Sequence, residues 1–160
     1  MISFKFVARY ILAVFLMFSV LPVQANEAVK VYSWKGSYED AKFSLQDAII
    51  GKGLKVVYEG HMSTMLERTS KDVGKPNPYL HAEYLLFCSA KLSNASVNAD
   101  PQNIGICPYI IFLYELKKEP GLIKIGYRKP SGGESKESKA ALKAIDILVD
   151  SIAKEAAEIE

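Results

Sequence analysis

The two cysteines carry the most reactive chemistry of this chain. Cys88 ends a predicted strand over residues 83–88, and Cys107 comes directly before Pro108 and the next predicted strand. Successive antiparallel strands joined at one end bring such positions together, so the two sulfur atoms can meet despite the 18 residues between them. In an oxidising compartment this pattern favours a structural disulfide, worth about 3 kcal/mol for a loop of this length.

A second interpretation gives the same pair a chemical role. Residues 89–97 are predicted to form a helical turn, and its backbone N–H groups and dipole would favour a thiolate on Cys88. The pair would then be redox-active or bind a soft metal, while a third interpretation leaves two unpaired thiols. The chain contains no C-x-x-C or C-x-x-C-H motif, so neither thioredoxin-like chemistry nor attached c-type haem is indicated.

Further polar and soft side chains lie near the first cysteine in the sequence. His61, Met62, Met65 and His81 would suit copper together with a thiol, but two methionines at helical spacing are more typical of ordinary packing. We therefore expect no metal and no cofactor. We place a candidate ligand pocket between the predicted sheet and the Cys88–Cys107 connection, with His61, Met65, His81 and Tyr109 as candidate lining residues.

The beginning of the chain indicates export. Lys5 and Arg9 precede an apolar stretch over residues 10–23 that is 14 residues long, and small residues follow up to Ala25. This pattern predicts a signal peptide over residues 1–25, because a transmembrane helix needs about 20 apolar residues. We accordingly expect a periplasmic or secreted product without an integral membrane segment, although an uncleaved N-terminal anchor is the alternative.

The remaining 135 residues, 26–160, fit one domain and carry 18 basic and 18 acidic side chains. A neutral domain lacks the positive field with which nucleic-acid-binding proteins collect phosphate contacts, so we expect no nucleic-acid partner.

Apolar periodicity predicts the elements that position these residues. Ser37 followed by Asp40 is typical of a helix start, and a helix over residues 37–50 follows from the apolar spacing. The long C-terminal segment carries a stripe from Ala141 to Ala156 and predicts a helix of about 22 residues that packs on a sheet. Strands are predicted over residues 30–35, 54–59, 83–88, 109–116 and 122–128, with a short helix over 63–72.

This order predicts an α+β fold of two layers, in which a mostly antiparallel sheet carries helices on one face. The almost uncharged run over residues 109–116 should be a central strand.

Several segments together resemble the domain of unknown function 302 family. They are Gly53–Val57, Leu85–Leu92, Ala99–Pro101 and Ile104–Ile111, and the resemblance covers residues 30–158. It implies a fold of the TATA-binding-protein-like class with the order β-α-β(4)-α, and it allows a homodimer. The family brings no established activity with it, and the fold does not bring DNA binding.

These observations favour an exported, single-domain binding or accessory protein without catalysis of its own, whose partner is a small molecule or another protein. The alternative is a thiol redox or copper-binding protein that uses Cys88 and Cys107. A hydrolase or isomerase based on carboxylates ranks last, because no recognisable arrangement of nucleophile and base is present.

Overall fold

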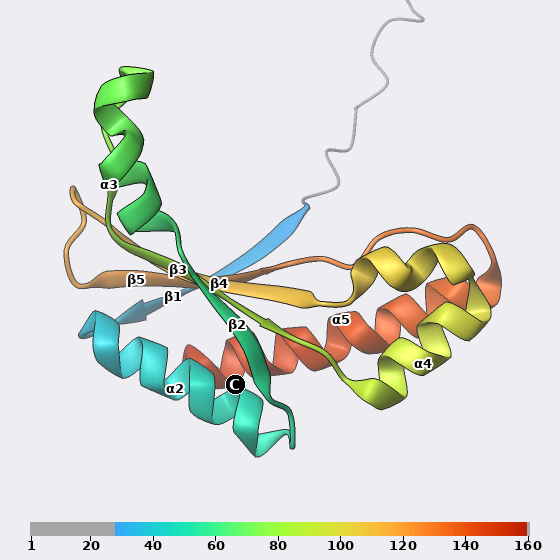
Figure 1. Ribbon diagram of the computed structural model, residues 1–160. Coiled ribbons are helices and arrows are strands. Elements are labelled where there is room, and N and C mark those ends of the chain that lie inside the picture. The colour runs from blue at the N-terminus through green and yellow to red at the C-terminus, as the bar shows by residue number, and fades with distance from the viewer. Residues whose placement is uncertain (1–27, 160) are drawn as a thin grey trace, which may run out of the picture.

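The computed structural model describes residues 28–159, which form a five-stranded antiparallel sheet with the strand order β1-β5-β4-β3-β2 (Figure 1). The predicted signal peptide over residues 1–25 lies outside these residues. The strands are β1 (Val29–Lys35), β2 (Val56–His61), β3 (Tyr79–Phe87), β4 (Tyr109–Leu116) and β5 (Leu122–Arg128). The helices are α2 (Tyr38–Gly51), α3 (Met62–Val73), α4 (Ala90–Ala99) and α5 (Lys136–Ala156), and a 3-10 helix, η1 (Pro101–Ile106), follows α4.

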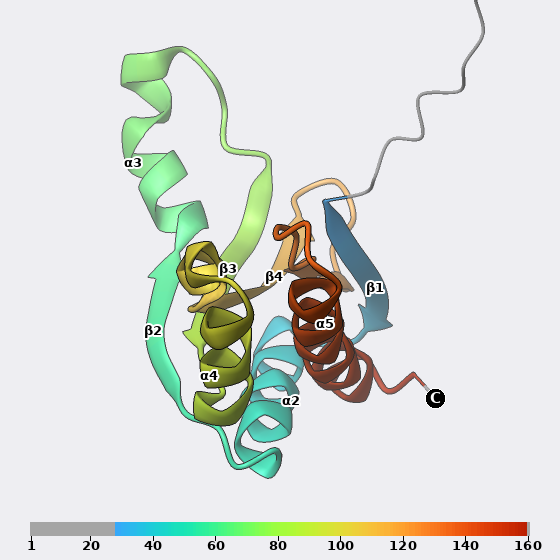
Figure 2. The same cartoon turned by 90° about the vertical axis from the view of Figure 1, so that its right-hand side faces the viewer.

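Two helices, α2 and α5, cover one face of the sheet. α4 packs against α5 and η1 at one end of this helical layer (Figures 1 and 2). The stripe of α5 is buried there, with Ile145, Val149 and Ile152 at most 1% exposed, and it packs against inward side chains of β4 and β5 such as Ile111 and Ile125. The two-layer α+β prediction is therefore confirmed.

Local capping explains where the helices begin. The Ser37 hydroxyl accepts a hydrogen bond from the Asp40 amide at 3.1 Å, as the spacing of these two residues predicts. Ser89 caps α4 in the same way, through the Leu92 amide at 3.4 Å. The predicted helical turn after Cys88 is thus a full helix of 10 residues, continued by η1.

The central position of the strand over residues 109–116 is confirmed, because β4 pairs with β3 on one side and β5 on the other. β3 begins at Tyr79, four residues earlier than the sequence predicts. α3 forms as expected and ends at Gly74, whose φ of 64° is left-handed. It does not join the helical layer, however: it has no fully buried residue and rises from the opposite side of the sheet (Figure 1).

The second face of the sheet consequently has no helix packed flat against it. We call it the open face. Across the described residues, no helix combines the length and the apolar character needed to traverse a lipid bilayer.

Candidate functional site

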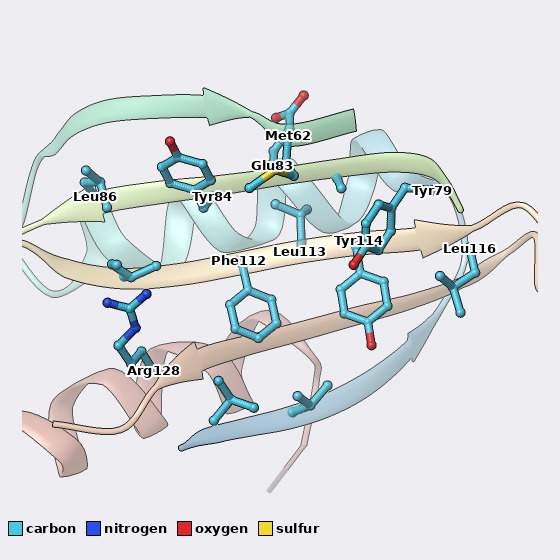
Figure 3. Close-up of a pocket in the computed structure, with 14 residues that line it drawn as sticks. Met62, Tyr79, Glu83, Tyr84, Leu86, Phe112, Leu113, Tyr114, Leu116 and Arg128 are labelled. Carbon is cyan, nitrogen blue, oxygen red and sulfur yellow. The ribbon is translucent and has the colours of Figure 1, made fainter. Parts of the chain in front are cut away.

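The open face is paved by a row of cross-strand neighbours. Gly126 on β5 pairs with Val31 on β1 and with Phe112 on β4, and the row continues through Tyr84 on β3 to Gly60 on β2. Because side chains alternate between the two faces of a strand, all five positions share the open face. The row therefore brings two aromatic rings to the middle of an uncovered surface (Figure 3).

Each aromatic ring lies over a glycine of the neighbouring strand. A Cβ atom on Gly126 would stand 2.7 Å from the Phe112 ring and 2.6 Å from the Lys30 carbonyl oxygen, closer than such atoms approach. A Cβ atom on Gly60 would overlap the ring of Tyr84. Glycine at these two positions lets the rings lie against the backbone, which holds them flat and in place.

Neighbouring side chains extend this floor into a hollow of about 690 Å³. The Tyr114 ring stacks near Phe112 with 6.2 Å between centroids, and Tyr79 contacts Tyr114 edge-on at 5.5 Å. Burial raises the pKa of Tyr114, so its hydroxyl stays neutral. The lining is apolar except at its ends; it comprises Val29, Val31, Met62, Tyr79, Ala82, Glu83, Tyr84, Leu86, Ile110, Phe112, Leu113, Tyr114, Leu116 and Arg128.

The cysteine pair lies at one end of the sheet. Cys88 and Cys107 are joined by a disulfide, and their Cα atoms are 5.8 Å apart. The bridge closes the segment that contains α4 and η1. A second hollow of about 210 Å³ adjoins this segment and is lined by Gly105, Ile106, Pro108, Tyr109, Ile110, Arg128, Lys129, Pro130 and Ser131.

The two predicted histidines lie on the helix-covered side, each beside a carboxylate. His61 Nδ1 is 3.2 Å from Glu83, and Glu83 also contacts the Lys42 ammonium of α2 at 2.6 Å. Burial of that ammonium acts to lower its pKa, but Glu83 and Glu59 outweigh this effect, so the pKa of Lys42 is raised. This cluster is an ion-paired tie between α2 and the sheet.

His81 stacks on Tyr38 of α2 with ring centroids 4.5 Å apart, and its Nε2 lies 3.9 Å from Glu115. Burial, and next the nearby Glu83, raise the pKa of Tyr38. Both histidine side chains are about half exposed, at 54% for His61 and 45% for His81. Within the described part of the chain, no group of three or more His, Cys, Asp or Glu is arranged to hold a metal ion.

The other two predicted lining residues lie apart from the histidines. Met65 is exposed on α3, and Tyr109 is buried in the core, where its hydroxyl is 2.9 Å from that of Ser93. Tyr109 also borders the hollow beside the Cys107 connection. His61, Met65 and His81 line neither that hollow nor the open-face hollow.

Sequence reasoning missed the residues that pave the open face, above all Phe112, Tyr84 and Arg128. The signal was present in β4, which is apolar at nearly every position from Tyr109 to Leu116 rather than at alternate ones. An antiparallel strand with one wet face alternates in polarity. A strand whose polarity does not alternate, in a sheet with helices on one face only, indicates that the other face of the sheet is apolar as well.

Comparison with known proteins places this arrangement among solved folds. No family model and no curated protein matches the chain. The crystal structure of an uncharacterized conserved protein, DUF302, from Bacillus stearothermophilus superposes with a TM-score of 0.68 at 14% sequence identity, covering 81% of this chain and 98% of that one. The chain has a DUF302-like fold. At this identity the similarity concerns the fold alone, so the DUF302-like fold positions the site but assigns it no activity.

Proposed function

We propose that this protein is an exported, non-catalytic binding protein that holds a ligand with an apolar body on the open face of its sheet. One observation carries the proposal: the row from Val31 through Phe112 and Tyr84 lies on a sheet face without a covering helix. Contiguous exposed apolar surface on a water-soluble domain marks a site of interaction. A hollow of about 690 Å³ lies in the size range of small-molecule sites.

The floor is organised before any ligand arrives. The rings of Phe112 and Tyr84 lie over glycines, and Phe112 also neighbours Tyr114, so little side-chain freedom remains to be lost on binding. A ligand that covers rigid aromatic rings gains from burial without a large ordering cost. Rigid rings therefore favour a role in binding.

The composition of the lining supports a role without catalysis. Its residues include no Ser, Cys or His, the usual nucleophiles and bases. Glu83 at the rim is engaged by Lys42 and His61. A site of this kind can orient and shield a ligand, and it offers no activated group to attack one.

The test is binding of Nile red, an uncharged dye whose fluorescence rises in apolar surroundings. We expect the wild-type protein to bind the dye and Phe112→Ser to weaken binding at least 10-fold. Phe43→Ser is the matched control, because Phe43 is 70% exposed on α2, outside the hollow, and should bind as wild type. Val31→Lys, at a position 41% exposed, is a second variant that places a charge in the floor without touching the core.

Two results would overturn the proposal. The first is a folded wild-type protein that binds no dye, or that loses binding equally in Phe43→Ser. The second is sedimentation of the wild-type protein as a dimer that Val31→Lys converts to monomers, because a second copy would then be the occupant of the open face.

We also propose that the cysteine pair has a structural role, separate from ligand binding. The bridge fixes the ends of β3 and β4 and closes the segment that contains α4 and η1. A thiol redox function is the second candidate, because Cys88 directly precedes the N-cap of α4, where a thiolate is stabilised. Redox titration separates the two: a structural bridge resists mild reductants, whereas a catalytic pair cycles with a glutathione buffer.

A further inference from the structure

The charges on the open face have one sign. The residues of β5 that share this face include Lys124 and Arg128, which stand on either side of Gly126. Among the described residues of β1, β3, β4 and β5, no Asp or Glu falls at a position that alternates onto this face with Phe112. Glu83 at the rim is ion-paired with Lys42 at 2.6 Å. The charge available to a ligand in the hollow is therefore positive.

The two cations differ in their partners. The Lys124 ammonium donates a hydrogen bond to the Ser33 hydroxyl at 2.7 Å. Arg128 forms no ion pair with any residue that the structure describes. Its guanidinium turns in over the sheet towards Leu86 (Figure 3). A guanidinium in this position presents several N–H donors in a plane, which suits a carboxylate.

Arg128 also joins two hollows. It lines both the large apolar hollow and the smaller one of about 210 Å³ beside η1. Lys129 and Ser131 add a second cation and a hydroxyl to the smaller hollow, which no Asp or Glu of the described chain lines. A ligand that spans the junction thus meets cationic, hydrogen-bonding surface at one end and aromatic rings along the rest.

We propose that the ligand is an amphipathic anion, whose carboxylate binds Arg128 and whose apolar body lies over Phe112 and Tyr84. This inference rests on the proposed binding function and names its ligand class. The floor follows β4 from Ile110 to Leu116, both of which line the hollow. Six strand steps span about 20 Å. An extended alkyl chain advances about 1.3 Å per carbon, so the floor accommodates a chain of about 12 to 15 carbons.

The test uses three probes that share one alkyl chain: dodecanoate, dodecanol and dodecyltrimethylammonium. Each is titrated against the Nile red complex of the full-length protein, and displacement gives its affinity. We expect the wild-type protein to bind dodecanoate 10- to 100-fold more tightly than dodecanol, as a charge-assisted hydrogen bond predicts. The cationic probe should bind more weakly than dodecanol, and added salt should reduce the preference for the anion.

The variants assign that preference to one residue. Arg128→Gln should lower the affinity for dodecanoate to that for dodecanol while leaving dodecanol unchanged. Arg128→Lys should keep part of the preference, because it keeps the charge without the planar donor pair. Lys124→Gln is the matched control on the same strand and face and should keep most of the preference. Arg128 is exposed, so its variants should melt as the wild type does.

The outcomes separate the two proposals. If dodecanoate and dodecanol bind equally, or if Arg128→Gln leaves the preference intact, the anionic ligand class is wrong and the binding function stands. If the cationic probe binds most tightly, the ligand class is equally wrong. If neither the dye nor dodecanol binds the folded protein, the binding function itself is overturned.

Discussion

Replacing the two glycines beneath the aromatic rings tests both the fold and the site. In Gly126→Ala the new methyl group would stand 2.6 Å from the Lys30 carbonyl oxygen and 2.7 Å from the Phe112 ring. The ring can rotate, but the carbonyl belongs to the backbone of β1 and can move only if the strands separate. We therefore expect Gly126→Ala to lower the free energy of unfolding by about 2 to 3 kcal/mol, near the upper end of the range for overpacked sites.

Gly60→Ala should cost less. The three atoms nearest to its new methyl group all belong to the Tyr84 ring, whose end can swing out over the open face. The unfolded chain also loses freedom when glycine becomes alanine, which returns about 0.4 to 1 kcal/mol. We expect Gly60→Ala to lower the free energy of unfolding by about 1 kcal/mol in total. In a double-mutant cycle, Tyr84→Ala should remove most of that loss, because it removes the ring that Gly60→Ala displaces.

Thermal unfolding followed by circular dichroism measures these differences. At about 4 °C per kcal/mol for a domain of this size, Gly126→Ala should lower the melting temperature by about 8 to 12 °C and Gly60→Ala by about 4 °C. Gly105→Ala is the control, since a methyl group there meets nothing within 4 Å. Both floor variants should also weaken Nile red binding. A Gly126→Ala protein that melts within about 1 °C of the wild type would show that Gly126 does not pack tightly against the Phe112 ring and the Lys30 carbonyl.

Three further predictions concern stability away from the open face. Replacing Cys88 and Cys107 together by alanine should lower the free energy of unfolding by about 3 kcal/mol, seen as a melting temperature about 12 °C lower, and an unchanged value would refute a stabilising bridge. Asn103→Ala should cost about 1 to 3 kcal/mol in urea unfolding, because it removes the two buried hydrogen bonds that the Asn103 amide donates, to the Ser96 carbonyl at 3.0 Å and to the Ser138 hydroxyl at 2.7 Å. Burial opposes ionisation of Asp150, but hydrogen bonds to its carboxylate outweigh this effect and lower its pKa. Asp150→Asn should therefore be less stable than the wild type by about 1 to 3 kcal/mol at pH 7, and the two melting temperatures should converge as the pH falls below about 4. A difference in melting temperature that stays constant with pH would contradict this.

The predictable parts of the fold are those that local pattern specifies. The apolar run of β4 marks a central strand with a partner on each side, and the spacing in α5 marks one face of a helix, because each pattern depends only on the period of its own element. The cysteine pairing could also be inferred from the sequence, for a related reason. Cys88 directly follows β3 and Cys107 precedes β4, and antiparallel pairing of consecutive strands returns the chain to the same end of the sheet.

The other features depend on contacts between segments distant in sequence. The pairing of β1 with β5 brings Val31 beside Gly126, residues nearly a hundred positions apart, and no local pattern encodes that register. The same holds for Gly60 beneath Tyr84. α3 shows the limit of periodicity in another way: its methionines have helical spacing, but that spacing does not say whether the stripe meets the core, and Met65 remains 39% exposed.

Folding alone does not account for the open face. The helix-covered side already supplies a continuous core, in which Leu113 and Ile125 are fully buried. Polar residues opposite them would keep that core and remove the tendency of an apolar sheet surface to associate. β4 instead carries Ile110, Phe112 and Tyr114 on its other side. These side chains add little to the core and favour aggregation when bare, and this is the physical reason for our proposal that an occupant covers them.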